Sequence, residues 1–176
     1  MMNYFELYGL PESFHTDAAA VKSKYYELSR RYHPDRFAQA GDAERAEVLR
    51  MAALNNDAWK TLNNADATMA YILKLHGLLE EEEKYNLPPD FLMEMMELNE
   101  TISEYEFEPG NEALKTQATE ALKEHLDAWI ADVAPLTAKF DAGVHDNAIL
   151  AQVKDYYFRK KYLLRIQQRI NTFATR

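Results

Sequence analysis

Apolar residues recur at intervals of three and four along most of this 176-residue chain, and this periodicity constrains the fold more than any other feature. Such spacing places side chains on one face of an α-helix, whereas a half-buried strand requires strict alternation. No segment shows that alternation or a hairpin turn signal. The sequence therefore predicts an all-α fold.

Three helices are expected in the first part of the chain. Residues 4–11 form a short apolar segment with a Gly-then-Pro stop, and a helix from Asp17, its N-cap, to about residue 32 follows. A longer alanine-rich helix runs from Asp42, a second candidate cap, to about residue 63. The apolar stripes expected on the two longer helices are Val21, Tyr25, Leu28 and Tyr32, and Leu49, Ala53, Asn56 and Trp59.

The tripeptide His33-Pro34-Asp35 lies between these two helices, where the proline should end the first of them and begin a loop. Four basic residues of the preceding helix fall off its apolar stripe. They leave an exposed basic surface that runs toward the tripeptide in a chain of net charge -9. These residues are Lys22, Lys24, Arg30 and Arg31.

The tripeptide is a poor candidate for catalysis or for metal binding. His33 and Asp35 are possible acid–base groups, but no nucleophile, glycine-rich phosphate loop or oxyanion donor accompanies them. The five histidines show no metal-ligand spacing, and cysteine is absent. We therefore expect no catalytic residue, no metal site and no cofactor.

The charge is unevenly distributed. Residues 80–112 carry twelve acidic side chains and one basic one, while residues 113–176 carry ten basic and seven acidic ones. No concentrated basic stripe exists for nucleic acid to bind. No apolar stretch reaches the roughly 18 residues that span a bilayer, and the start lacks the form of a secretion signal. We expect a cytoplasmic protein that binds neither nucleic acid nor membrane.

A run of four glutamates at residues 80–83, followed by Pro88 and Pro89, marks the expected domain boundary. We expect domains at residues 1–76 and 89–176, joined by a solvated linker at residues 77–88. The second domain reads as a three-helix bundle. Its helices begin near Pro89, Asn111 and Val144, and Pro135 should kink or interrupt the middle one. The expected stripes are Phe91, Met95, Leu98, Ile102 and Tyr105; Leu114, Ala118, Leu122, His125, Trp129, Val133, Leu136 and Phe140; and Ile149, Val153, Tyr156, Leu163, Ile166 and Ile170.

The opposite face of the first bundle helix is also apolar. Leu92, Met93 and Met96 lie about 100° to 200° around the helix from Phe91, and three glutamates follow beside them. Flexible thioethers with an acidic border are typical of a partner-binding surface. Spacing alone leaves open whether the first domain or the linker covers this patch instead. The three glutamates are Glu97, Glu100 and Glu104.

The order of a short helix, a basic helix, a His-Pro-Asp loop and a return helix resembles the J-domain of DnaJ-type co-chaperones. Separate blocks along the chain are similar to HscB, the J-protein family of iron–sulfur cluster assembly, and together they cover nearly the whole chain. The blocks are Tyr4-Phe5-x-Leu7-x-Gly9-Leu10-Pro11, Tyr32-His33-Pro34-Asp35-Arg36-Phe37-Ala38, Ala58-Trp59-Lys60-Thr61-Leu62, Tyr71-x-Leu73-x-Leu75-His76-Gly77 and Phe91-Leu92-Met93-Glu94-x-x-Glu97-Leu98.

The resemblance implies two sets of contact residues. In J-proteins the loop and the basic helix engage the ATPase domain of a DnaK-type chaperone, here HscA-like, and stimulate hydrolysis. In the HscB family the first bundle helix binds the scaffold protein IscU. The matching chaperone-binding residues are His33, Pro34, Asp35, Lys22, Tyr25 and Arg31. The matching scaffold-binding residues are Leu92, Met93, Glu97, Glu100 and Glu104, with Met96 where a leucine is often found, and the aromatic Phe158, for which a place in the core is the alternative.

The resemblance therefore implies a monomeric co-chaperone that is not itself an enzyme. It delivers an IscU-like scaffold to an HscA-like chaperone and activates the chaperone's ATPase during cluster transfer. Tyr26 and Glu27 stand where DnaJ is often basic, and DnaJ's glycine-phenylalanine linker and zinc-binding cysteines are missing, so general delivery of unfolded proteins is not expected. Two rivals remain open at this point: a J-domain adaptor for a different client protein, and a small helical hydrolase.

Overall fold

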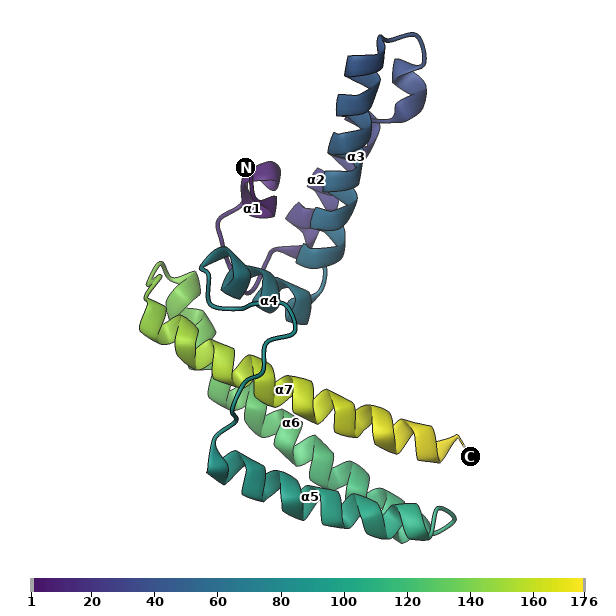
Figure 1. Ribbon diagram of the computed structural model, residues 1–176, viewed down its shortest axis with the longest axis vertical. Coiled ribbons are helices and arrows are strands. Elements are labelled where there is room, and N and C mark those ends of the chain that lie inside the picture. Colours follow the sequence, from purple (N-terminus) through teal and green to yellow (C-terminus); the bar gives the residue numbers. More distant parts are fainter. Residues whose placement is uncertain (1, 176) are drawn as a thin grey trace. The chain divides into compact units, whose positions relative to one another are not determined.

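The computed structural model describes residues 2–175, and within that range it contains seven α-helices, one 3-10 turn and no strand. The all-α class is confirmed. The chain divides into two compact units, and the division falls between Gly77 and Leu78 (Figure 1). None of the helices within residues 2–175 combines the length and the apolarity needed to cross a membrane.

The first unit is built around a pair of antiparallel helices, α2 and α3, which the 3-10 turn η1 joins at one end (Figure 1). Of the two shorter helices, α1 packs against both members of this pair and α4 packs against α3. The bounds are α1 Tyr4–Tyr8, α2 Ala18–Arg31, η1 Pro34–Phe37, α3 Asp42–Leu62 and α4 Ala65–Leu75. This is the helical hairpin that the sequence predicts.

Local capping explains where these helices begin and end. The Asp17 side chain accepts hydrogen bonds from the backbone N–H groups of Ala19 and Ala20, as an N-cap does. Gly9 ends α1 at a φ of 62°, a left-handed conformation that costs glycine little. Asp42, by contrast, is the first residue of α3 and not its cap: Gly41 occupies the cap position, without a side-chain bond.

The apolar stripe of α3 differs from the predicted one. Leu49 is 58% exposed, and the stripe that the structure buries is shifted by one residue, or about 100° around the helix. This stripe consists of Val48, Asn55, Ala58 and Leu62. The prediction was wrong for two reasons. Alanines lie on several faces of this helix, so more than one face looks apolar, and the face that is buried includes a polar residue, Asn55.

Asn55 is only 1% exposed, and its side chain connects three helices of the first unit. Its Oδ1 accepts a hydrogen bond of 2.8 Å from the Tyr8 hydroxyl of α1. Its Nδ2 donates to the carbonyl oxygen of Tyr25 (3.0 Å) and to Oγ of Ser29 (3.1 Å), both on α2. The side-chain amide is therefore paired at both ends, as a buried polar group requires.

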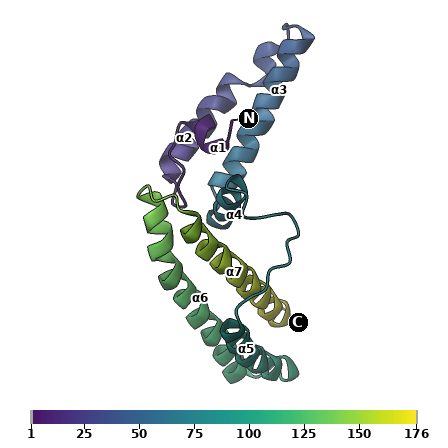
Figure 2. The same cartoon turned by 60° about the vertical axis from the view of Figure 1, so that its left-hand side comes forward.

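The second unit is a three-helix bundle in which α6 runs antiparallel to both α5 and α7 (Figures 1 and 2). The bounds are α5 Pro89–Phe107, α6 Glu112–Asp141 and α7 Asn147–Ala174. The predicted stripe of α5 is buried at every position, since Phe91, Met95, Leu98, Ile102 and Tyr105 are at most 6% exposed.

The sequence predicts that Pro135 kinks or interrupts α6, and the structure shows no interruption. The helix continues through it from Glu112 to Asp141. A proline removes the hydrogen bond to the carbonyl group four residues earlier, which here belongs to Ala131. Both residues lie on the exposed side of the helix, where water can satisfy that carbonyl group.

The segment before α5, expected to be a solvated linker, is anchored on α7. The Tyr85 hydroxyl donates a 2.8 Å hydrogen bond to Asp155, and Glu83 pairs with Lys154 at 2.8 Å. The side chains of Glu83 and Lys154 are only 19% and 21% exposed. Residues 78–88 therefore belong to the second unit.

Candidate functional site

The first candidate surface is the His33 turn, which we define as residues 33–36. His33 is the N-cap of η1, and its Nδ1 accepts a hydrogen bond of 3.3 Å from the backbone N–H of Asp35. In the neutral imidazole this leaves the proton on Nε2, which remains free to donate. The side chains of His33 and Asp35 are 56% and 91% exposed, so the turn presents a donor and a carboxylate to the solvent.

A rigid backbone supports these two side chains. Pro34 is in the first turn of η1, where its fixed φ favours the tight helical conformation. The Arg36 guanidinium group donates a 3.1 Å hydrogen bond to the carbonyl oxygen of Arg30 in the last turn of α2. This bond satisfies a carbonyl group at the helix end and ties the turn back to α2.

The three other predicted chaperone-binding residues lie on α2, but not on one face of it. Tyr25 is half-buried, since its ring stacks on Trp59 with centroids 4.8 Å apart. Lys22 and Arg31 are both exposed. Nine residues separate them, which places their side chains about 180° apart around the helix. The structure therefore brings Lys22 and Tyr25 onto neighbouring rows and leaves Arg31 on the far side.

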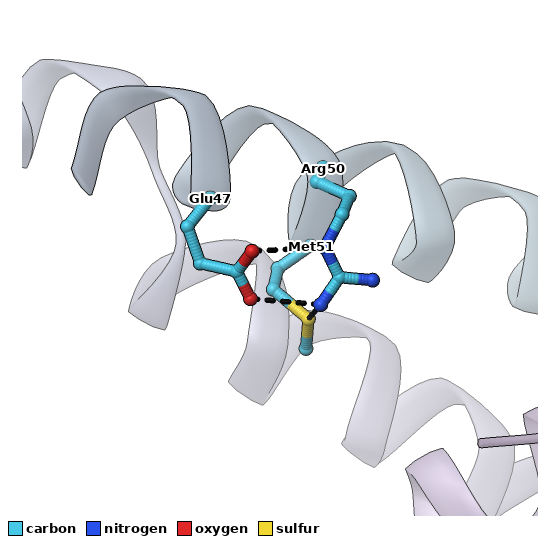
Figure 3. Close-up of polar contacts among 3 residues, drawn as sticks. All are labelled: Glu47, Arg50 and Met51. Atoms are coloured by element: carbon cyan, nitrogen blue, oxygen red, sulfur yellow. Dashed lines mark hydrogen bonds and ion pairs between the residues drawn. The ribbon is translucent and has the colours of Figure 1, made fainter. Parts of the chain in front are cut away.

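Arg50 of α3 carries a positive charge that is already paired. Its guanidinium group donates to both carboxylate oxygens of Glu47, at 2.9 and 2.7 Å, and also contacts Sδ of Met51 at 3.4 Å (Figure 3). The hydrogen bond from Arg50 lowers the pKa of Glu47 below its ordinary value. Because this pair is locally neutral, the basic character near the His33 turn comes from α2 and Arg36.

The second candidate surface is the α5 face, which we define as Leu92, Met93, Met96, Glu97, Glu100 and Glu104. All six side chains are exposed. Met93 and Met96 are each 64% exposed and Leu92 is 41% exposed, although the other side of the same helix is fully closed in the core. Within its own unit this patch is therefore uncovered, and residues 78–88 do not shield it.

The α5 face combines adaptable apolar groups with negative charge. Two thioether side chains conform easily to another surface, and the glutamates beside them favour a basic partner. The face is shallow and open, which suits contact with a protein better than the enclosure of a small molecule. Within residues 2–175 no cluster of histidine and carboxylate side chains is placed to hold a metal ion.

Phe158 lies apart from the exposed α5 face, and the structure decides between the two positions that the sequence left open for it. It is 9% exposed because Tyr85 stacks on its ring, with centroids 4.6 Å apart and an interplanar angle of 7°. Burial, together with the hydrogen bond to Asp155, raises the pKa of Tyr85 to about 12. Phe158 is a core aromatic residue, which was the alternative at the sequence level.

Sequence reasoning missed a polar row along the edge of α5 that faces α7. The Asn99 amide donates to the Tyr162 hydroxyl (3.0 Å) and accepts a bond from Arg169 (3.2 Å), which also contacts Ser103 and Glu106. A signal for this row exists in the sequence, because Asn99 and Ser103 continue the three- and four-residue steps from Leu92 and Met96.

Comparisons with known proteins agree on one family. The family model described as the HSCB C-terminal oligomerisation domain matches residues 87–171. The chain is 37% identical over 130 residues to a relative named Co-chaperone protein HscB homolog, from Vibrio vulnificus (strain YJ016). That alignment covers 71% of this chain and 76% of the relative.

Two solved structures resemble this fold over most of its length. The crystal structure of human co-chaperone protein HscB matches with a TM-score of 0.76 and 29% identity, covering 97% of this chain and 81% of the human one. The chaperone HscB from Vibrio cholerae matches with a TM-score of 0.66 and 30% identity, covering 97% of this chain and 96% of that one.

Proposed function

The chain belongs to the HscB family of co-chaperone proteins, and from that premise we propose that it joins two partners with its two units. The first unit stimulates the ATPase of an HscA-like chaperone of the DnaK type through the His33 turn and α2. The second unit binds an IscU-like scaffold protein through the α5 face and delivers it for iron–sulfur cluster transfer. The chain accelerates its partner's reaction and is not itself the enzyme.

The observation that carries this proposal is the exposure of Met93 and Met96, each 64%, on a helix whose opposite side is fully buried. An exposed apolar patch bordered by glutamates is expected where another protein binds reversibly. The patch lies in the second unit, whereas the His33 turn lies in the first. Two separate surfaces suit a protein that holds a client while acting on a chaperone.

The His33 turn supports contact with a polar protein surface. It offers a fixed Nε2 donor and an exposed carboxylate, and Lys22 and Tyr25 of α2 extend this surface along the helix. Positive charge on α2 favours an acidic docking site on the chaperone. Each tenfold stimulation of ATP hydrolysis requires about 1.4 kcal/mol of preferential binding to the transition state for hydrolysis.

The size of the α5 face predicts a modest affinity. Full burial of a leucine or methionine side chain contributes about 1.5 to 3 kcal/mol. Binding can bury only the part that is still exposed, which is 64% for Met96 and 41% for Leu92, so each contributes less than the full amount. Association itself costs about 4 kcal/mol or more. Such a surface binds a client and releases it again, as delivery requires.

A pair of variants tests the division of roles. We expect His33→Gln to abolish stimulation of an HscA-like ATPase, because Gln lacks the ring that fixes the donor, while scaffold binding stays unchanged. We expect the double variant Leu92→Ala with Met96→Ala to weaken binding of an IscU-like scaffold about ten- to a hundredfold, since the lost burial is about 1.4 to 2.8 kcal/mol. Its stimulation of the ATPase without scaffold should persist.

Ile130→Ala is the matched control, because Ile130 is 59% exposed on α6, outside the α5 face. It should bind scaffold as the unchanged protein does. Calorimetric titration measures binding, and phosphate release measures hydrolysis. Normal stimulation by His33→Gln would refute the role of the first unit. Unchanged scaffold affinity in the double variant would refute the role of the second and favour a different client.

The remaining expectations belong to the same proposal. We propose that the protein works in the cytoplasm, where its lack of cysteine suits a reducing environment, and that it binds neither nucleic acid nor membranes. The matching family model is described as an oligomerisation domain, so the monomeric state that we expect stays a prediction. A molar mass of 20.4 kDa in sedimentation equilibrium would identify a monomer.

A further inference from the structure

A shallow depression continues from the α5 face toward α7. Its first part has a volume of about 450 Å³ and is lined by Met96, Asn99, Glu100, Ser103 and Glu104 of α5. Its second part has a volume of about 240 Å³. It is lined by Asn99 together with Tyr162, Arg165, Ile166 and Arg169 of α7. Asn99 belongs to both linings, so the two parts adjoin each other.

The walls of this depression are held at a fixed spacing. Asn99 is bonded to Tyr162 at 3.0 Å and to Arg169 at 3.2 Å, so one amide of α5 reaches two residues of α7 that lie two turns apart. Arg169 also bonds Ser103 and pairs with Glu106. A surface that is already ordered loses little entropy when a partner binds to it.

The two walls carry opposite charges. Glu100 and Glu104 are exposed on α5, and Arg165 is exposed on α7. Arg169 is already paired with Glu106, whereas Arg165 forms no ion pair with any residue in the described part of the chain. The depression therefore offers carboxylates on one side, an unpaired guanidinium group on the other, and the Met96 thioether at its edge.

We propose that Arg165 belongs to the scaffold-binding surface, and that the depression selects the partner by charge. The inference rests on the function proposed above. The occupant is a segment of the scaffold protein with three neighbouring groups: an apolar side chain for Met96, a basic side chain for Glu100 and Glu104, and a carboxylate for Arg165. A wholly basic segment would leave Arg165 facing a like charge, and a wholly acidic one would be repelled by the glutamates.

The scaffold's carboxylate gains most from Arg165 because a guanidinium group can bind both of its oxygens at once. The pair would form at the rim of an interface, where its contribution is moderate and sensitive to salt. Asn99 acts as a positioning residue, since both ends of its amide are committed to α7.

The test is a titration of the full chain with a purified IscU-like scaffold protein at low and high salt. Arg165→Ala should weaken binding about three- to tenfold at low salt, and the difference should shrink at high salt. Arg165→Glu should weaken it further. Lys139→Ala is the matched control, because it removes one exposed positive charge from α6, away from the depression. It should leave the affinity unchanged.

The double variant Leu92→Ala with Met96→Ala separates this inference from the proposed function. If it weakens binding while Arg165→Ala and Arg165→Glu bind normally, the scaffold uses the α5 face but not the depression, and the inference is overturned. If neither it nor the Arg165 variants change binding, the proposed function itself fails. Equal losses of affinity in Arg165→Ala and Lys139→Ala would show that binding depends on net charge and not on the position of Arg165. This result would also overturn the inference.

Discussion

The buried amide of Asn55 allows a sharp test of the first unit, because Asn55→Asp changes the chemistry at one atom and almost nothing in size. The replaced Nδ2 donates to the Tyr25 carbonyl oxygen at 3.0 Å and to Ser29 at 3.1 Å. An oxygen in that place would face the Tyr25 carbonyl group without a proton between them. Since Asn55 is 1% exposed, the introduced carboxylate would also lose its hydration.

Burial and the facing carbonyl group should raise the pKa of the introduced carboxyl group by about two to three units above its value in the unfolded chain. At pH 7 the folded state must then hold an unfavourable charge, so the free energy of unfolding should fall by about 3 to 4 kcal/mol. The penalty should shrink as the pH falls through the raised pKa toward the ordinary value near 4, because the folded state then binds the proton first.

Asn56→Asp is the matched control, one residue further along the same helix. Asn56 is exposed, and its Oδ1 accepts a 3.3 Å bond from the Tyr25 hydroxyl, which a carboxylate can accept equally well. Its effect should stay within about 0.5 kcal/mol. Urea unfolding at pH 7 and pH 5, followed by circular dichroism, measures both variants. A loss below about 1 kcal/mol for Asn55→Asp at pH 7 would refute the buried hydrogen-bond network.

Three further changes probe the second unit by the same unfolding measurement. Tyr85→Phe should lower stability by about 1 to 2 kcal/mol because it removes the 2.8 Å bond to Asp155. The pKa of Tyr85 is raised to about 12, so the stability gained from the protonated Tyr85 hydroxyl is fully present below pH 10 and is lost as the pH rises through 12. The variant has no hydroxyl group and should lack this pH dependence. Pro135→Ala should raise stability by about 1 to 3 kcal/mol, since it restores the bond to the Ala131 carbonyl group; no gain would contradict this account of the helix. Phe158→Ala should cost about 3 kcal/mol or more, as loss of a core ring does, and a cost below 1 kcal/mol would show that the ring is not buried.

Helical spacing was sufficient to predict the core of α5, because polar residues separate its two apolar rows clearly. Phe91 and Met95 belong to the buried row, while Leu92 and Met96 belong to the exposed one. Spacing failed on α3, where many alanines fit more than one phase and where Asn55 occupies a core position. A buried polar residue is invisible to a pattern of hydrophobicity, since only its partners on other helices justify its burial.

The candidate site divides in the same way. The six residues of the α5 face could be predicted because they share one helix, and helix geometry fixes their relation to one another. Phe158 could not be placed, because the ring that covers it, Tyr85, comes from an irregular segment far away in the sequence. Likewise, the depression beside Asn99 depends on how α5 and α7 pack, which no single helix determines.

The exposure of Met93 and Met96 has a chemical consequence apart from binding. A thioether open to solvent reacts with peroxide to give a sulfoxide, which is polar and chiral, and the chain has no cysteine that would react first. Oxygen added at these two sulfur atoms would make the exposed apolar part of α5 hydrophilic without unfolding the bundle. Oxidation in air would therefore weaken the proposed binding of a scaffold protein before it destabilises the fold, and a methionine sulfoxide reductase would reverse the change.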